Sequence, residues 1–124
     1  MSRVVFLNGE YKDYNNAFTH VEDRGYQFAD GVYEVFSVKN GKLIDYTGHI
    51  NRLSRSLNEI SIKYPINIRS ILFHMRNIIR KNLIVDGLIY LQITRGVAKR
   101  DFKFPKNLDS TITIIGNNIP SDEY

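Results

Sequence analysis

The sequence predicts an α+β domain, in which a mostly antiparallel sheet of about six strands packs against two helices. Three observations point to this class. Asn-Gly pairs at Asn8-Gly9 and Asn40-Gly41 each separate short runs of strand-forming residues, which is typical of tight hairpins. Two later segments repeat apolar residues at spacings of three and four, the period of a helix with one buried face. Apolar runs at 88–94 and 111–115 add strands toward the C-terminal end.

The first 40 residues are predicted to form a hairpin and then a longer strand. Strands at 4–7 and 11–13 flank the first Asn-Gly pair, and a polar segment, 14–22, follows them. The stretch 23–36, DRGYQFADGVYEVF, begins with turn residues and enters a strand at 32–38. Because strand side chains alternate between faces, one face should carry Tyr33, Val35 and Ser37, and the other Val32, Glu34, Phe36 and Val38. Tyr33 is therefore expected near a turn, where a pocket can form.

The second Asn-Gly turn is predicted to return the chain as a strand at 43–46, with a helix after it. Thr47 is a good N-cap, and the apolar stripe of this helix consists of Ile50, Leu53, Leu57 and Ile60. His49 and Arg52 are expected side by side in the first turn, where free N–H groups favour an anion and a guanidinium can bind phosphate. The pair is either an anion site or a solvated helix face.

A second, longer helix is predicted after Pro65, with Asn67 as its N-cap. Its apolar stripe comprises Ile68, Ile71, Leu72, Met75, Ile78, Ile79 and Leu83. His74 stands between the two helix faces, where we expect a hydrogen bond at the boundary of the core. Beyond the strand at 88–94, a basic loop with interleaved aromatic residues occupies 97–106.

The composition is that of a folded domain with a basic surface. Hydrophobic residues make up 43% and charged residues 24%, and Lys and Arg outnumber Asp and Glu by 17 to 13, a formal charge of +4. This charge favours an anionic partner, such as a nucleic acid, a phosphate-bearing cofactor or a carboxylate substrate.

The residue types that are absent exclude several kinds of chemistry. The lack of cysteine excludes disulfides, thiolate metal sites and cysteine nucleophiles, and indicates a reducing cytoplasm. The first apolar run is too short for a signal peptide or a membrane span. His20 has no second ligand at metal spacing, so no metal site is expected.

Motifs along essentially the whole chain resemble one family of enzymes. The stretch DRGYQFADGVYEVF, an Asn-Gly hairpin, HINRLSRS, a long helix, IYLQITRG and KRDFKFP follow one another as in the amino-terminal domain of D-amino acid aminotransferases. Those enzymes belong to the fold-type IV, or class IV, pyridoxal-phosphate family, which also includes the branched-chain aminotransferases and aminodeoxychorismate lyase. The resemblance implies a pyridoxal 5'-phosphate cofactor, a D-amino acid (or branched-chain-like) substrate, a 2-oxo acid substrate and a dimer.

The resemblance also implies roles for four residues. Tyr33, in GVYEV, matches a tyrosine that helps to hold the substrate carboxylate. Arg52, in HINRL, matches the arginine that binds the cofactor phosphate, and His49 matches the histidine beside it. Arg100, in KRDFKFP, matches an arginine that reaches over the substrate carboxylate, typically from the partner subunit. A histidine two positions after that arginine in the D-amino acid enzymes is replaced here by Phe102, which leaves the choice of substrate open.

The catalytic lysine of the family has no counterpart in this chain. In the family, that lysine and most phosphate ligands lie in a carboxy-terminal domain, which is absent here. Residues 1–116 match the amino-terminal small domain, and residues 117–124 match the start of the interdomain linker. No Schiff-base position is matched by Lys42, Lys63, Lys81 or Lys99. The chain alone is therefore expected to be inactive and to retain no cofactor, because one arginine–phosphate contact contributes less than association costs.

Three functions are compatible with these observations. The first is the N-terminal half of a D-amino acid aminotransferase, either truncated or completed by a separate carboxy-terminal half. The second is a non-catalytic oligomeric interaction module, because the surface that meets the other domain in the family would be exposed. The third, a nucleic-acid-binding domain, would use the loop residues Lys99, Arg100, Phe102, Lys103, Phe104 and Lys106, and is disfavoured because Asp101 interrupts their charge.

Overall fold

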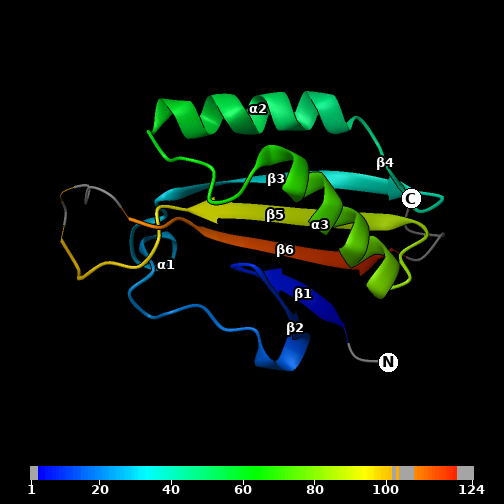
Figure 1. Ribbon diagram of the computed structural model, residues 1–124, viewed down its shortest axis with the longest axis horizontal. Coiled ribbons are helices and arrows are strands. Elements are labelled where there is room, and N and C mark those ends of the chain that lie inside the picture. Colours follow the sequence, from blue (N-terminus) through cyan, green and yellow to red (C-terminus); the bar gives the residue numbers. More distant parts are fainter. Residues whose placement is uncertain (1–2, 102, 104–107, 120–124) are drawn as a thin grey trace.

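The structure is a computed structural model of the chain and describes residues 3–101, 103 and 108–119. Its elements in chain order are β1 (Val4–Leu7), β2 (Glu10–Asp13), the 3₁₀ turn η1 (Tyr14–Asn16), α1 (Arg24–Phe28), β3 (Gly31–Lys39), β4 (Lys42–Leu43), α2 (Tyr46–Glu59), α3 (Ile68–Lys81), β5 (Gly87–Thr94) and β6 (Thr111–Asn118). The six strands form one antiparallel sheet in the order β2-β1-β6-β5-β3-β4. Helices α2 and α3 cover one face of it (Figure 1). The predicted α+β class is confirmed.

Both predicted hairpins form around their Asn-Gly pairs. Asn8 and Gly9 have φ values of 49° and 91°, and Asn40 and Gly41 have 51° and 74°, the left-handed values that such turns require. The first hairpin pairs along the whole of β1 and β2. In the second, β4 pairs with only the last two residues of β3. Most of β3 therefore has no strand beside it on that edge within the described residues.

The chain leaves the sheet earlier than the sequence predicts. The predicted strand at 43–46 and the predicted N-cap at Thr47 are both wrong. Asp45 adopts a left-handed φ of 52°, which turns the chain, and α2 begins at Tyr46. The Asp45 side chain accepts no hydrogen bond from the start of the helix. As a result Arg52 lies in the second turn of α2 rather than the first.

The second predicted helix, α3, is confirmed together with its cap. Asn67 accepts a hydrogen bond from the Arg69 N–H at 2.8 Å. The buried residues of the helix are Ile71, Met75, Asn77, Ile78 and Ile79. Leu83, which the apolar stripe included, lies beyond the helix end with a φ of 51° and is 65% exposed. The spacing of apolar residues could not show that the backbone turns after Lys81.

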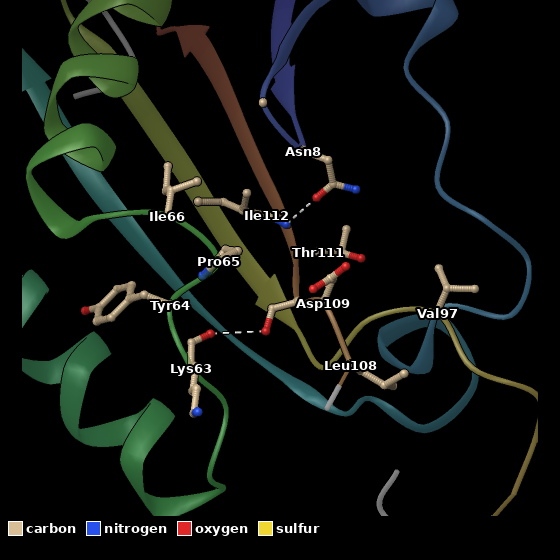
Figure 2. Close-up of a pocket in the computed structure, with 12 residues that line it drawn as sticks. Asn8, Lys63, Tyr64, Pro65, Ile66, Val97, Leu108, Asp109, Thr111 and Ile112 are labelled. Atoms are coloured by element: carbon tan, nitrogen blue, oxygen red, sulfur yellow. Dashed lines mark hydrogen bonds between the residues drawn. The ribbon is translucent and has the colours of Figure 1, made fainter. Parts of the chain in front are cut away.

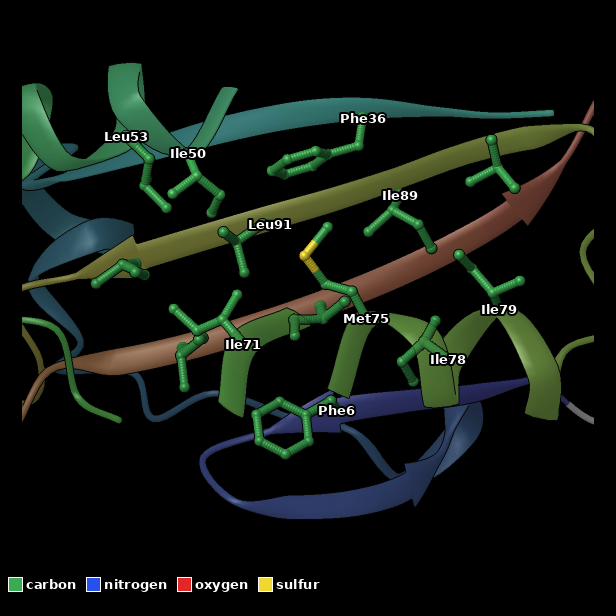
Figure 3. Close-up of a cluster of buried hydrophobic side chains, with 14 of the residues drawn as sticks. Phe6, Phe36, Ile50, Leu53, Ile71, Met75, Ile78, Ile79, Ile89 and Leu91 are labelled. Carbon is green, nitrogen blue, oxygen red and sulfur yellow. The ribbon is translucent and has the colours of Figure 1, made fainter. Parts of the chain in front are cut away.

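One apolar core joins the covered face of the sheet to the two helices. Alternation along β3 is as predicted, because Phe36 and Val38 are buried while Tyr33, Val35 and Ser37 are exposed. Figure 3 shows helix side chains, among them Ile50, Leu53, Met75 and Ile78, packed against the strand residues Phe36, Ile89 and Leu91. Glu34 belongs to this same buried face, so a carboxylate lies at the border of an apolar layer.

Helix α3 lies close against β6 and is tied to β1. A Cβ atom at Gly116 of β6 would come within 2.5 Å of the Ile84 Cδ1 atom and 2.9 Å of the Ile78 Cγ2 atom, so any larger residue here would displace these isoleucine side chains. Just past α3, the Asn82 side chain accepts from the Val4 N–H at 2.8 Å and donates to the Val4 carbonyl at 2.9 Å. These contacts fix the first strand against the middle of the chain.

His74 of α3 makes the boundary hydrogen bond that the sequence predicts. Its Nδ1 atom is hydrogen-bonded to the hydroxyl of Tyr11 in β2. Its ring stacks on Phe6, with the two centroids 4.1 Å apart. Burial lowers the pKa of His74, so the ring favours the neutral form that accepts from Tyr11.

The short helix α1, just before β3, was not predicted from the sequence. Its N-cap is Asp23, whose Oδ1 atom accepts from the Gly25 N–H at 2.8 Å, and Ala29 ends it with a left-handed φ of 53°. A helix of 5 residues is too short to display a repeating apolar stripe. It brings Arg24 into the interior, where this residue is 2% exposed.

Candidate functional site

Glu34 is a buried carboxylate on the covered face of β3. It is 4% exposed and lies opposite Leu91 of β5. An unpaired charge in such a place is costly, and α2 supplies its partners. Arg52 donates from Nε to one carboxylate oxygen and from Nη2 to the other, both at 2.7 Å, and His49 Nδ1 lies 2.8 Å from Oε1. Glu34, His49 and Arg52 together form the Glu34 cluster.

The cluster keeps Glu34 ionised. The hydrogen bonds from Arg52 lower the pKa of Glu34 and outweigh burial, which raises it, and His49 lowers it further. The same contact raises the pKa of Arg52. Because an ionised carboxylate only accepts hydrogen bonds, the His49 ring donates from Nδ1 and directs Nε2 away from Glu34.

Arg52 keeps part of its guanidinium available for a ligand. Its side chain is 58% exposed, and Glu34 occupies Nε and Nη2 but not Nη1. A guanidinium held on one side by a carboxylate can donate from the other to a phosphate or carboxylate oxygen. The sequence-based interpretation relied on the free N–H groups of the first helical turn. In the structure Arg52 lies one turn further along α2, away from those N–H groups. Glu34, and not the start of the helix, is the group that holds Arg52 in place.

Tyr33 lies on the opposite, open face of the sheet. It is 63% exposed, and its ring stacks on Tyr90 of β5 with centroids 5.7 Å apart. The Tyr90 hydroxyl donates to Gln92 at 2.7 Å. Tyr33 and Gln92 help to line a cavity of about 260 Å³, together with Gly25 and Ala29 of the α1 segment. This cavity lies near the turn before β3, where the sequence predicts a pocket.

Tyr33 and the Glu34 cluster lie on opposite faces of the sheet, next to the same unpaired edge of β3. They are on opposite faces because neighbouring strand residues alternate, yet β4 pairs only with Val38 and Lys39, so the edge of β3 beside them has no strand next to it among the described residues. A ligand that contacts both Tyr33 and Arg52 must lie across this edge.

Arg100 is an exposed residue on the loop after β5. Its guanidinium carbon lies 5.6 Å from the centroid of the Phe28 ring in α1. The structure therefore brings His49 and Arg52 together, places Tyr33 around the neighbouring edge and places Arg100 against α1. Phe102, residues 104–107 of the basic loop and residues 120–124 of the predicted linker lie outside the described residues.

Glu34 is the functional residue that the sequence-based interpretation missed. The signal was present, because alternation along the strand put a carboxylate on the same face as Phe36 and Val38. A carboxylate on an apolar face predicts a cationic partner. Which cation fills that role depends on the register of α2 over β3, and that register is visible only in the fold.

A larger cavity, of about 780 Å³, lies between the loops at 63–66 and 108–112 (Figure 2). Asn8 accepts from the Ile112 N–H at 2.9 Å, and the Ser110 hydroxyl donates to the Lys63 carbonyl at 3.1 Å on its walls. None of the four residues singled out from the sequence lines it. Size therefore does not identify the candidate site, which rests on the chemistry around β3.

Residues 3–101, 103 and 108–119 contain neither a metal-ligand cluster nor a membrane-spanning helix. No three histidine, aspartate or glutamate side chains converge there as metal ligands. No helix in the same part of the chain has the length and apolar character to cross a membrane.

Two solved structures with a similar fold are branched-chain amino acid aminotransferases. The branched-chain amino acid aminotransferase from Escherichia coli superposes with a TM-score of 0.88 at 20% identity, over 96% of this chain and 42% of that one. A second branched-chain amino acid aminotransferase, from T.th. and solved with pyridoxamine 5'-phosphate, superposes with a TM-score of 0.89 at 13% identity, over 98% of this chain and 41% of that one. At these identities the likeness shows the fold alone, an α+β domain.

Sequence comparison places the chain in a family. The family model for amino-transferase class IV matches residues 31–124. The D-alanine aminotransferase of Staphylococcus haemolyticus is 43% identical over 101 residues, which cover 82% of this chain and 36% of the relative. The D-alanine aminotransferase of Listeria innocua is 37% identical over 122 residues, 96% of this chain and 42% of the relative.

The chain therefore belongs to the class IV aminotransferases, as its motifs indicated. It spans 36% and 42% of the length of these two relatives.

Proposed function

We propose that this chain forms one side of the cofactor and substrate site of a transaminase acting on D-amino acids and 2-oxo acids. Residues 1–116 act as the N-terminal domain and residues 117–124 lead into the linker, with Asn117 and Asn118 still paired in β6. A lysine-bearing segment outside this chain completes the site. The observation that supports this proposal most strongly is the Glu34 cluster at the unpaired edge of β3, in a chain whose relatives include D-alanine aminotransferases.

The Glu34 cluster fits the phosphate of pyridoxal 5'-phosphate. Nη1 of Arg52 is not used by Glu34, so it can donate to a phosphate oxygen, and His49 lies beside it on the same carboxylate. When bound, the cofactor supplies the electron sink that amino-group transfer needs. In this proposal Glu34 orients Arg52, while Tyr33 and Arg100 bind the substrate carboxylate.

We expect the chain alone to bind no cofactor stably. Association costs about 4 to 15 kcal/mol before any contact contributes, and an exposed arginine with a neighbouring histidine does not offset that. A purified sample mixed with pyridoxal phosphate should emerge from gel filtration without cofactor absorbance. Absorbance that stays with the protein peak would contradict this expectation.

Complementation tests the proposed activity. The chain would be mixed with the separately expressed carboxy-terminal half of the Listeria innocua relative, and transfer from D-alanine to 2-oxoglutarate would be assayed. Activity should appear only in the mixture. Failure with every D- and L-amino acid offered, although the two halves co-purify, would overturn the proposal.

A pair of arginines on α2 tests the cofactor role within the assembled enzyme. Arg52→Ala should raise the Kd for pyridoxal phosphate roughly tenfold or more, because it removes a charge-assisted hydrogen bond. Arg55→Ala is the matched control, since Arg55 is also exposed and lies three residues further along the same helix. Equal effects of the two substitutions would remove Arg52 from the site.

We also propose that the chain self-associates when it is alone. The open face of the sheet exposes Tyr33 at 63% and Val35 at 36%, and apolar surface of this kind promotes association. Light scattering should show oligomers that Val35→Lys dissociates. Phe73→Lys is the control, because Phe73 is 60% exposed on α3, away from that face. A monomer at high concentration would contradict the proposal.

A further inference from the structure

The loop that carries Arg100 is fastened to the segment around α1 by its backbone. The Arg24 N–H donates to the Gly96 carbonyl at 2.8 Å, and the Ala98 N–H donates to the Glu22 carbonyl at 3.2 Å. An isolated β-bridge between Asp23 and Val97 lies between these two bonds. The first half of the loop therefore follows α1 rather than solvent.

A buried side chain holds the same loop at Asp101. Arg24 is 2% exposed, and its Nη1 atom donates to the Asp101 carbonyl at 2.7 Å. The carbonyl group of Asp101, the residue after Arg100, is thus held by a guanidinium from α1. A hydrogen bond from a charged donor in a buried place is among the stronger ones available.

Arg24 is itself held in place by Asp30. The Oδ2 atom of Asp30 accepts from Arg24 Nε at 2.8 Å and from Arg95 Nε at 2.7 Å. Burial raises the pKa of Asp30, but the hydrogen bonds and charges of Arg95 and Arg24 outweigh it and lower the pKa. Arg95 also donates to the Ile60 carbonyl at 2.7 Å, which ties the arrangement to the end of α2.

Phe28 is shared between the two guanidinium groups. The ring lies 4.6 Å from the guanidinium carbon of Arg24 and 5.6 Å from that of Arg100. Both distances are within the range in which a cation is attracted to a ring face. The Arg100 side chain, which has many rotamers in water, thus has a preferred surface to lie on.

We propose that Arg24 and Phe28 are positioning residues that pre-orient Arg100 for the substrate carboxylate. This inference rests on the proposed function, in which Arg100 binds that carboxylate. Arg24 holds the loop backbone at Gly96, before Arg100, and at Asp101, after it. Phe28 limits the positions that the Arg100 guanidinium adopts. An arginine ordered before the substrate arrives loses less conformational entropy on binding, so affinity rises without any new contact to the substrate.

The positioning itself can be measured on the chain alone. In NMR spectra, the δ-methylene protons of Arg100 should carry a ring-current shift that disappears in Phe28→Leu. Phe73→Leu makes the same chemical change on the outer side of α3 and should leave the shift in place. An Arg100 signal that is identical in wild type and Phe28→Leu would overturn the inference.

The consequence for binding is measured in the complemented enzyme. Phe28→Leu should raise KM for the 2-oxo acid roughly three- to tenfold, with kcat and the Kd for pyridoxal phosphate unchanged. Phe28→Tyr keeps the ring face and should restore the wild-type KM. Arg24→Lys keeps a cation near Asp30 but loses the fork that reaches Asp101, so it should also raise KM. A fall in kcat without a change in KM would overturn the inference.

Arg100→Ala separates failure of the inference from failure of the proposed function. If this substitution leaves KM unchanged, Arg100 does not bind the carboxylate, and both fall together. If it raises KM while Phe28→Leu does not, only the positioning role is overturned.

Discussion

The covered face of the sheet is apolar from β1 to β3 except at Glu34, whereas the open face carries tyrosine, glutamine and threonine side chains. The same strands supply both faces, since Phe36 and Leu91 point to the helices while Tyr33 and Gln92 point away. The covered face is complete, because α2 and α3 bury it within this chain. The open face holds the stacked Tyr33 and Tyr90 rings partly exposed. The apolar core is therefore confined to the covered face, which carries the Glu34 cluster at its border, while Tyr33 lies on the open face.

The largest expected effect compares two aromatic residues of β3. Phe36→Ala should lower the free energy of unfolding by about 3 to 5 kcal/mol, because Phe36 is fully buried and its removal leaves a cavity. Tyr33→Ala should change it by less than about 0.5 kcal/mol, because Tyr33 is mostly exposed. Urea titration measures both. Similar losses from the two substitutions would mean that the open face also contributes to folding.

A smaller effect is expected at Glu34, where the covered face carries a charge. Glu34→Gln should lower the free energy of unfolding by roughly 1.5 to 3 kcal/mol, since it weakens hydrogen bonds to a charged acceptor. Glu59→Gln, at an exposed position of α2, is the control and should have little effect.

The contribution of Glu34 to stability also depends on pH. Its pKa is below the ordinary 4.5 in the folded chain, so the contribution is complete above pH 4.5 and is lost as the pH falls through the folded-state pKa. An unchanged acid limb in Glu34→Gln would contradict this account.

The smallest expected effect concerns His74, at the boundary of the covered face. Burial lowers its pKa below the ordinary 6.5, so the unfolded chain takes up a proton first when the pH falls below 6.5. The unfolding free energy should then decrease with falling pH by less than about 1.4 kcal/mol per pH unit. Thermal unfolding between pH 7 and pH 5 should show a weaker pH dependence in His74→Gln. His20→Gln is the control, because His20 is exposed, and it should keep the wild-type slope.

Much of the sheet could be predicted from short-range chemistry. The Asn-Gly turns require left-handed backbone, and alternation along β3 assigns Phe36 and Tyr33 to opposite faces. Asn67 could be recognised as a cap because its side chain accepts a hydrogen bond from the backbone only two residues further on, at Arg69. Thr47 was a reasonable cap by residue type, but the left-handed turn at Asp45 starts the helix one residue before it.

The candidate site could be predicted only in part, because its contacts join distant segments. His49 and Arg52 share a helix face, so their proximity follows from helical spacing. Their carboxylate partner lies on β3, and no local pattern gives the register between α2 and that strand. The contact of Arg24 with the Asp101 carbonyl spans 77 positions, and the short helix that places Arg24 has no periodic signal.

The short β4 has a consequence for anything that docks between Tyr33 and Arg52. Backbone groups directed to that side of β3 have no ladder partner among the described residues before Ser37, whose carbonyl accepts from the Ile44 N–H at 2.9 Å. The Gly31 N–H donates locally to the Ala29 carbonyl at 3.0 Å, so water is the remaining partner for the groups of Tyr33 and Val35 on this edge. An incoming molecule has to strip this water, and an extended peptide could replace it by adding as a further strand. The opening that admits a ligand to both faces is thus also the place where an unaccompanied chain is most exposed to edge-to-edge aggregation.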